Sequence, residues 1–269
     1  MGNESTEYHA GSWNELSDLL FEGAWQADLG RLRSPWVFRG QGDAGFDLTT
    51  SLQRIGPNFR EVESPLLRAF RRYAHRSGPG RSDTVWNWLA LAQHHGLPTR
   101  LLDWSYSPYV ALHFATCETG LWRHDGAVWC VDFAHFNRRL PEVMQEVLRS
   151  EGASVFTAEM TADCADAVPA LDALAPEPFL LFFEPPSFDD RIVNQFALFA
   201  LLSGADTVMG EWLRKQAGES LRRIVIPADL KREVRDRLDQ TGVTERVLLP
   251  GLDGLSAWLS RYYGYRSRE

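Results

Sequence analysis

The chain has 269 residues and a formal net charge of −8, and 44% of its residues are hydrophobic, among them 10 tryptophans and 15 phenylalanines. This length is compatible with one large domain or two small ones, and the apolar content is ample for a sizeable core. The negative charge argues against binding of nucleic acid or an anionic membrane through bulk charge, although it does not exclude a local basic groove.

The cysteines and the N-terminus define the expected cellular context. Three cysteines, an odd number without CxxC spacing, predict reduced thiols in the cytoplasm. No zinc motif is present, so no metal site is expected. The N-terminus lacks an apolar signal segment, and no apolar run approaches the ~20 residues of a membrane span. Gly2 and Thr6 fit a myristoylation pattern, but that motif is short and common by chance.

The first half of the chain mixes helical and extended patterns behind a polar N-terminal tail, residues 1–12. Ser12 and Glu15 form a capping box, which predicts a helix over 13–25. Further along, the patterns predict a strand at 36–41, an extended piece at 46–53, an amphipathic helix at 61–75 and a flexible connector at 77–83.

Residues 83–115 form the most distinctive stretch, an apolar run that carries histidine, arginine and aspartate side chains. Asp83 is placed to cap a first helix, and Gly96 to end it with a positive φ. The next helix begins at Ser107, an N-cap that is followed by proline. The segment between these helices, residues 99–105, is expected to be extended.

The second half carries further strands among helices. Residues 141–178 become acidic and rich in small residues, and we interpret them as a helical insertion at the surface. The other predicted elements are strands at 127–133, 179–183, 223–226 and 246–250, and helices at 228–239 and 251–263. Strands scattered among helices without strict βαβ alternation predict a single α+β domain over residues 13–265.

Arg39 stands near the end of the strand predicted at 36–41 and precedes Gly40. An arginine followed by glycine allows a phosphate or ribose to approach the backbone closely. The alternative is a structural arginine that pairs with Asp43 or Asp47 on the surface. The residues alone leave both interpretations open.

His94 and His95 are adjacent, so on a helix their side chains point about 100° apart and cannot easily share one metal ion. One is expected to cap carbonyls or to pair with Asp103, and the other to face a cleft. Arg100 and Asp103 are expected to form a buried ion pair that fixes the loop. These four residues are therefore assigned structural roles.

Other polar and aromatic residues are candidates for contact with a ligand. Trp104 and Ser105 are placed to line a pocket, by ring stacking and by hydroxyl hydrogen bonding. Arg191 and Gln195 are spaced i, i+4, which on a strand projects both to one side. The alternative for the glutamine is a hydrogen bond to backbone at the edge of the core. His113 lies among apolar helical residues and is interpreted as a core histidine.

Together these motifs resemble those of the FRG domain family, whose name-giving Phe-Arg-Gly is Phe38-Arg39-Gly40 here. The run LALAQHHGLPTRLLDWSYSPYVALHFA (89–115) closely matches the family's Gln-His-x-Gly-x-Pro-Thr-Arg-Leu-Leu-Asp-Trp core. An Arg-x3-Gln-x-Gly-x-Phe element resembles residues 191–199, with alanine instead of the usual glycine at 197. The Leu-Leu-Pro-Gly-Leu-Asp-Gly ending at 248–254 also fits, so the resemblance covers nearly the whole chain.

The layout of this family is similar to the ADP-ribosyltransferase-like fold, which implies a small, mainly antiparallel split sheet flanked by helices. The resemblance implies that Arg39 holds the ribose of NAD, and that Thr99 or Ser105 takes the second-strand role. Gln195 would occupy the third-strand position, where that superfamily usually has glutamate. A glutamine cannot act as a general base or stabilise an oxocarbenium ion by charge.

The resemblance implies an NAD-dependent ADP-ribosyltransferase or NAD-cleaving toxin-like enzyme in bacterial antiviral (anti-phage) defence, with an unidentified macromolecular acceptor. In such an enzyme the charge role would pass to Asp103 or Glu184. The alternatives are a non-catalytic module that binds a nucleotide or partner on the same fold, and an interaction subunit in which the motif is a core network. The expected site comprises catalytic Arg39, Ser105 and Gln195, and NAD-binding Gly40, Gln41, Thr99, Trp104, Tyr109 and Arg191.

Overall fold

The computed structural model describes residues 7–74, 83–216 and 218–264. The myristoylation pattern at Gly2 and Thr6 and most of the predicted connector lie outside the described residues. Of the predicted polar tail, Glu7–His9 form a short edge strand. No helix in the described part of the chain is long and apolar enough to cross a membrane.

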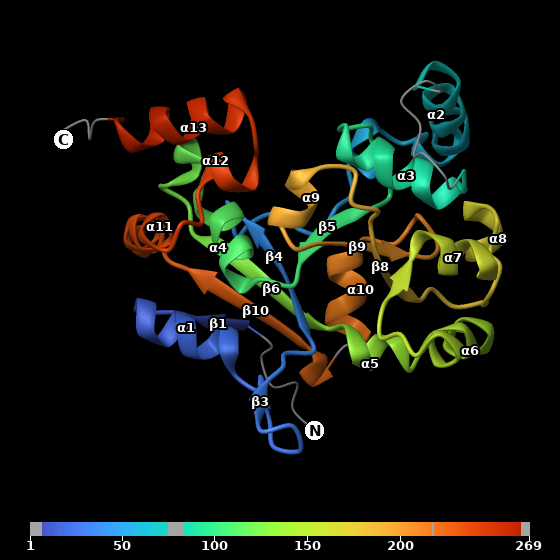
Figure 1. The fold of residues 1–269 in the computed structure, drawn as a ribbon, viewed down its shortest axis with the longest axis horizontal. Helices are drawn as coiled ribbons and strands as arrows, with labels where there is room; N and C mark the ends of the chain where they lie inside the picture. The colour runs from blue at the N-terminus through green and yellow to red at the C-terminus, as the bar shows by residue number, and fades with distance from the viewer. Residues whose placement is uncertain (1–6, 75–82, 217, 265–269) are drawn as a thin grey trace.

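Eight strands of the described chain form one sheet in the order β1-β10-β6-β4-β5-β9-β8-β7 (Figure 1). Neighbours are antiparallel except at the two edges, where β1 pairs with β10 and β7 with β8 in parallel. The strands are β1 (Glu7–His9), β4 (Trp36–Gln41), β5 (Leu102–Ser105), β6 (Gly126–Asp132), β7 (Phe156–Thr157), β8 (Leu180–Glu184), β9 (Ala197–Leu202) and β10 (Leu221–Ile226). A separate hairpin consists of β2 (Trp25–Gln26) and β3 (Arg31–Leu32). The mixture of helices with a mainly antiparallel sheet is confirmed, whereas the expectation of a small, split sheet is wrong, because the sheet is large and continuous.

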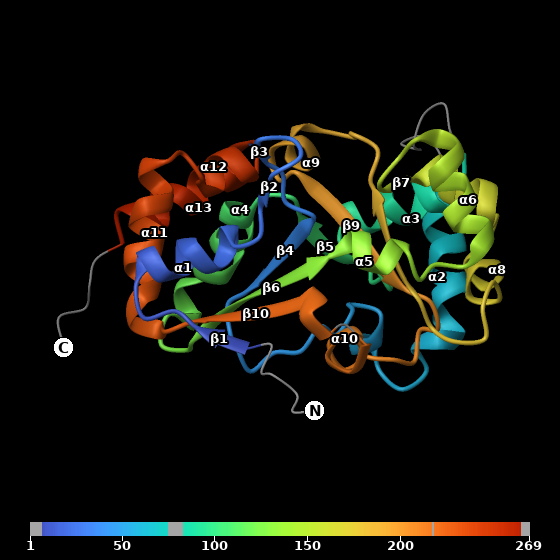
Figure 2. The same cartoon turned by 90° about the horizontal axis from the view of Figure 1, so that it is seen from below.

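Most helices lie toward the two ends of the sheet, whereas α5, α9 and α10 lie between these groups (Figure 1; Figure 2). The helices are α1 (Trp13–Phe21), α2 (Phe59–Ala74), α3 (Val85–His94), α4 (Pro108–Thr116), α5 (Phe133–Asn137), α6 (Glu142–Glu151), α7 (Ala158–Cys164), α8 (Val168–Asp172), α9 (Asp190–Asn194), α10 (Met209–Gln216), α11 (Lys231–Gln240), α12 (Glu245–Leu248) and α13 (Leu252–Tyr262). In both views α1, α4, α11, α12 and α13 lie toward one end, and α2, α3, α6, α7 and α8 toward the other. The predicted insertion corresponds to α6, α7 and α8, which contribute buried side chains to the core at that end.

Alternating side chains place three apolar cores on the two faces of the sheet. Phe38 faces a core shared with α1, α4 and α11. Phe199 faces a second core, which α3, α6 and α7 complete. The register from Phe38 through Ser105 to β9 places these two cores on the same face. Trp104 faces the opposite side, where α5 and α10 cover a third core.

The pairing between β4 and β5 is the shortest in the sheet, and the two cores on one face meet at this place. These strands share a single residue pair, Phe38 with Ser105, whereas β4 pairs with β6 along its whole length from Trp36 to Gln41. Helix α4 packs on β4 and β5 beside this junction. The fold therefore leaves an opening between two central strands, bordered by a helix.

Three local predictions were wrong for identifiable reasons. The extended piece predicted at 46–53 ends early, because residues 51–52 form a turn that leads into a 3-10 helix at Gln53–Ile55. The strand predicted at 246–250 is helix α12, a single turn whose Leu248 is buried. Arg191 lies in helix α9, not in a strand, because Asp189 caps that helix by accepting hydrogen bonds from two backbone N–H groups.

The central segment folds nearly as its pattern predicts. Helix α3 ends before Gly96, whose φ is +79°. Ser107 caps α4 by accepting a hydrogen bond from Val110 N. The cap of α3 is Thr84 and not Asp83, whose carboxylate instead accepts hydrogen bonds from side chains on α2 and α3.

Candidate functional site

A cavity of about 290 Å³ lies where β4 and β5 part. Its walls come from β4, β5, the start of β9, α4 and α9. The predicted site residues that line it are Arg39, Gly40, Trp104, Ser105, Arg191 and Gln195. The structure thus brings together three sequence motifs that lie far apart in the chain.

Within the described part of the chain, Arg39 enters the cavity without a carboxylate partner. Its register partner is Trp129, so the side chain leaves β4 on the face opposite Phe38 and Gly40. One guanidinium nitrogen, Nη1, donates to the backbone carbonyl of Asp103 at 2.5 Å across the gap. Arg39 forms no ion pair among the described residues, so the alternative of a surface pair with Asp43 or Asp47 is wrong. A cation placed in this way retains the capacity to bind an anion.

Two enclosed donors in the cavity wall have no acceptor among the residues that the structure describes. The Arg39 side chain is half-buried, and its Nε is inaccessible to solvent and lacks a partner. The indole Nε1 of Trp104 is likewise enclosed and unpaired. Burial lowers the pKa of Arg39, and the charge of Asp103 opposes that shift. Because solvent does not reach either atom, neither is open to a ligand in the cavity, and the capacity of Arg39 to bind an anion lies in the terminal nitrogens of its guanidinium.

Further charged groups surround this cation. Arg191 is exposed, lines the cavity, and forms no side-chain hydrogen bond or ion pair with the residues that the structure describes. The positive charge of Arg54 also acts on Arg39. Two acidic residues, Asp103 and Glu118, line the same cavity. The site therefore combines cations, which can bind an anionic group, with carboxylates, which can accept hydrogen bonds from hydroxyls.

Gly40 serves helix packing, which differs from the predicted approach of a ligand to the backbone. A Cβ at this position would collide with the backbone carbonyl of Ala111 and would lie 2.7 Å from Ala115 N. Both atoms belong to α4, so the missing side chain allows this helix to lie directly on β4. The glycine thereby brings the helical wall of the cavity close to the backbone of β4.

The hydroxyl of Ser105 is occupied by local structure. It donates to the carbonyl of Gln195 at 2.7 Å and accepts from Ser107 N at 2.9 Å. The amide Nε2 of Gln195 donates to the carbonyl of Leu248 at 2.8 Å, as the alternative of a backbone hydrogen bond predicted. This bond leaves the amide oxygen of Gln195 without a partner in the described chain. Ser105 is therefore a positioning residue, and Gln195 offers the cavity a neutral acceptor.

Three predicted ligand contacts lie outside the cavity. The Gln41 side chain donates to the Asp47 carbonyl and accepts from the Trp129 indole. Thr99 is buried, with its hydroxyl bonded to Gln93. Tyr109 packs on the rings of α1 at the other side of α4. None of these three side chains belongs to the cavity lining.

Arg100 pairs with other partners than the one predicted. Its guanidinium contacts Glu63 on α2 and Asp172 at the end of α8, and its side chain is only 6% exposed. The predicted pair with Asp103 is therefore wrong, and the Asp103 carboxylate accepts instead from the Gln93 amide at 2.9 Å. A structural role for Arg100 fits this geometry.

The two adjacent histidines lie away from the cavity wall. His94 Nε2 lies 2.7 Å from Asp189, the cap of α9, and not beside Asp103, which was one of the two partners considered for either histidine. Asp189 has a lowered pKa, because hydrogen bonds and charge from His94 outweigh the opposing effect of desolvation. His95 is the exposed C-cap of α3. His94 thus braces the helix that carries Arg191.

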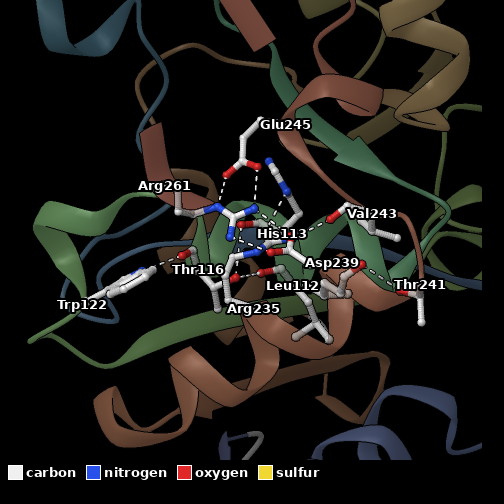
Figure 3. Close-up of polar contacts among 11 residues, drawn as sticks. Leu112, His113, Thr116, Trp122, Arg235, Asp239, Thr241, Val243, Glu245 and Arg261 are labelled. Carbon is white, nitrogen blue, oxygen red and sulfur yellow. Dashed lines mark hydrogen bonds and ion pairs between the residues drawn. The ribbon is translucent and has the colours of Figure 1, made fainter. Parts of the chain in front are cut away.

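A buried charged cluster behind α4 was not predicted from the sequence (Figure 3). Arg261 on α13 binds the carboxylates of Asp239 and Glu245 together. Arg235 donates to His113 Nδ1 at 2.9 Å, which fixes α11 against α4. Burial, followed by the charge of Arg235, lowers the pKa of His113 to about 3, so this core histidine is neutral.

This cluster reaches the cavity through α4 and α12. The Gln195 amide donates to the Leu248 carbonyl at the end of α12, and the neighbouring Asn194 donates to the Val247 carbonyl at 2.8 Å. On α4, the cavity side includes Phe114 and Cys117, whose spacing from Val110 follows the helical period. That periodicity was the sequence signal that could have identified them. Burial raises the pKa of the Cys117 thiol to about 11.

Among residues 7–74, 83–216 and 218–264, no group of three or more His, Cys, Asp or Glu side chains is arranged to hold a metal ion.

The comparisons with known proteins identify one domain. The FRG domain family matches residues 34–121. This match includes the Phe38-Arg39-Gly40 motif and the run 89–115, whereas the motif at 191–199 lies beyond it. No curated protein and no solved structure matches the chain.

Proposed function

The chain contains an FRG domain, and we propose that its cavity binds the phosphate and ribose of a nucleotide, with NAD as the first candidate ligand. The observation that carries the proposal is Arg39, a half-buried guanidinium in the cavity that has no carboxylate partner among the described residues. Arginine binds phosphate through a planar fork of donors, and the bond from Nη1 to the Asp103 carbonyl occupies only part of that fork.

The size of the cavity limits how much of such a ligand it encloses. Its volume of about 290 Å³ is near the lower end of the ~300–1,000 Å³ that small-molecule pockets span. A mononucleotide-sized part would therefore be enclosed, and the rest of a dinucleotide would extend past Arg191 at the rim. The amide oxygen of Gln195, which has no partner among the described residues, is suited to accept from a ribose hydroxyl.

Binding is tested by calorimetry with NAD, ADP-ribose and AMP on the wild-type chain, Arg39→Leu and Arg39→Lys. Arg39→Leu is expected to weaken binding roughly 30-fold or more, because a charged hydrogen-bonded contact is lost. Arg39→Lys should retain part of the affinity, because it keeps the charge and loses the fork. Arg149→Leu on the exposed surface of α6 serves as the control. Absence of binding, or an unchanged affinity in Arg39→Leu, refutes the proposal.

A second candidate function is glycosyl transfer from NAD, which the carboxylates of Asp103 and Glu118 in the same cavity favour. In that reaction the bond between nicotinamide and ribose breaks, the electron pair leaves with nicotinamide, and an acceptor or water forms the new bond to ribose. A carboxylate would stabilise the positive charge that develops on the ribose, which Gln195 cannot do. Glu184 lies outside the cavity lining and accepts a hydrogen bond from Tyr106 at 2.9 Å.

Release of nicotinamide distinguishes the two functions. If the chain is a transferase or NAD-cleaving enzyme, incubation with NAD and cell lysate should release nicotinamide, and Asp103→Asn should slow this without abolishing NAD binding. Tight binding without release identifies a non-catalytic nucleotide-binding module. Label transfer to protein or RNA in the lysate would identify the class of acceptor.

A further inference from the structure

Phe196 has an unusual backbone conformation at the border of the cavity. Its φ is 48°, and it is the only non-glycine residue with a positive φ among the described residues. The left-handed region disfavours side chains because Cβ approaches the following carbonyl oxygen, and asparagine or glycine is usual there. Phe196 directly follows Gln195, the C-cap of α9, where a residue in this conformation often ends a helix, although glycine is the usual choice.

The surrounding structure holds this strained turn through several bonds. Phe196 N donates to the Val193 carbonyl at 3.1 Å, and the Phe196 carbonyl accepts from Tyr106 N at 3.1 Å. The Ser105 hydroxyl holds the preceding carbonyl, that of Gln195. The turn is therefore determined by both flanking elements, and no local relaxation of Phe196 is available without breaking a hydrogen bond.

The ring that this turn presents is exposed. Phe196 is 59% exposed, and it lies against no other aromatic ring in the described chain. Its chain neighbours Gln195 and Ala197 both line the cavity, whereas Phe196 itself does not. Phe196 is thus an exposed aromatic residue flanked in the chain by two residues of the cavity lining. Burial in the core does not account for it, and a single exposed apolar residue without strain would need no account.

We propose that Phe196 is a binding residue, a platform on which the heterocyclic base of the nucleotide stacks while its phosphate contacts Arg39. This inference rests on the proposed function, and it assigns the ligand class as a nucleotide with an unpaired base. An exposed aromatic ring stacks on any base, so the contact contributes affinity with little selectivity among bases. Val193, which is 56% exposed in α9, extends the apolar surface next to the ring.

The test compares ligands that differ only in the base. Affinities for AMP, nicotinamide mononucleotide and ribose 5-phosphate are measured on the wild-type chain, Phe196→Asn and Phe196→Tyr. Asparagine tolerates the positive φ and lacks the ring, and tyrosine keeps the ring. We expect Phe196→Asn to weaken binding of at least one of the two nucleotides roughly 5- to 150-fold and to leave ribose 5-phosphate unchanged. Phe196→Tyr should retain wild-type affinities.

Thermal unfolding of the same variants separates binding from folding. Because asparagine relieves the strain, Phe196→Asn is expected to unfold at the wild-type temperature or above it. If it unfolds earlier and loses all three ligands equally, the ring is structural and the inference is overturned. If Arg39→Leu loses all ligands while Phe196→Asn binds nucleotides normally, the inference fails and the proposed function stands. If the wild-type chain binds none of the three, both fail.

Discussion

The substitution Arg261→Leu tests whether the buried charged cluster holds the C-terminal helices in place. The Arg261 side chain is 6% exposed and contacts Asp239 and Glu245, whose side chains are 14% and 6% exposed. Removing the cation leaves two enclosed carboxylates with Arg235 as their remaining basic neighbour, 3.5 Å from Asp239. Breaking a buried pair in this way destabilises by roughly 3–5 kcal/mol. The remaining arginine compensates in part, so we expect about 3 kcal/mol.

The assay is urea unfolding followed by tryptophan fluorescence, with the free energy obtained by linear extrapolation. Arg237→Leu on α11 is the matched control, because that arginine pairs with Glu233 and both side chains are 47% exposed. An exposed pair contributes about 0.2–1 kcal/mol, so the control should stay close to wild type. If Arg261→Leu loses no more stability than Arg237→Leu, the cluster does not hold these helices and the reasoning is refuted.

Four further outcomes follow from the structure. Gly40→Ala should lower the free energy of unfolding in urea by about 1–3 kcal/mol or more, because the new Cβ meets the backbone of α4. The control Gly120→Ala has open space around it and should be nearly neutral. Equal losses in the two variants would contradict the packing role of Gly40. Arg100→Leu should lose roughly 3–5 kcal/mol in the same assay, since it leaves two carboxylates unpaired, and a loss under about 1 kcal/mol would contradict this. Glu245 has a lowered pKa, because hydrogen bonds from Arg261 outweigh desolvation. Its carboxylate therefore stabilises the fold above its unfolded pKa, and the difference in free energy of unfolding between wild type and Glu245→Gln should shrink as pH falls below about 4.5. A difference that widens at low pH would contradict this. Cys117, with a pKa of about 11, should alkylate slowly at pH 8 and faster toward pH 11, as mass spectrometry after iodoacetamide would show; fast labelling at pH 7 would refute the assigned burial.

The local predictions that succeeded depend on neighbouring residues. The strand at Trp36–Gln41 and the helix that begins after Ser107 follow from patterns and caps within a few positions. Helix α9 was missed although its signal is equally local, because Asp189 was not recognised as an N-cap. The strand predicted at 246–250 failed because a short apolar run is compatible with either structure.

The sequence by itself determined several residues that line the cavity: its motifs already contained Arg39, Trp104, Arg191 and Gln195. Only the tertiary structure decided what these residues contact. Arg39 finds a carbonyl 64 positions away, and Arg100 finds carboxylates 37 and 72 positions away instead of a near neighbour. Such pairings depend on which strands adjoin and which helices cover them, because burial makes an unpaired charge costly wherever the chain happens to place it. The opening between β4 and β5, and the unpaired cation within it, exist only once the sheet has formed.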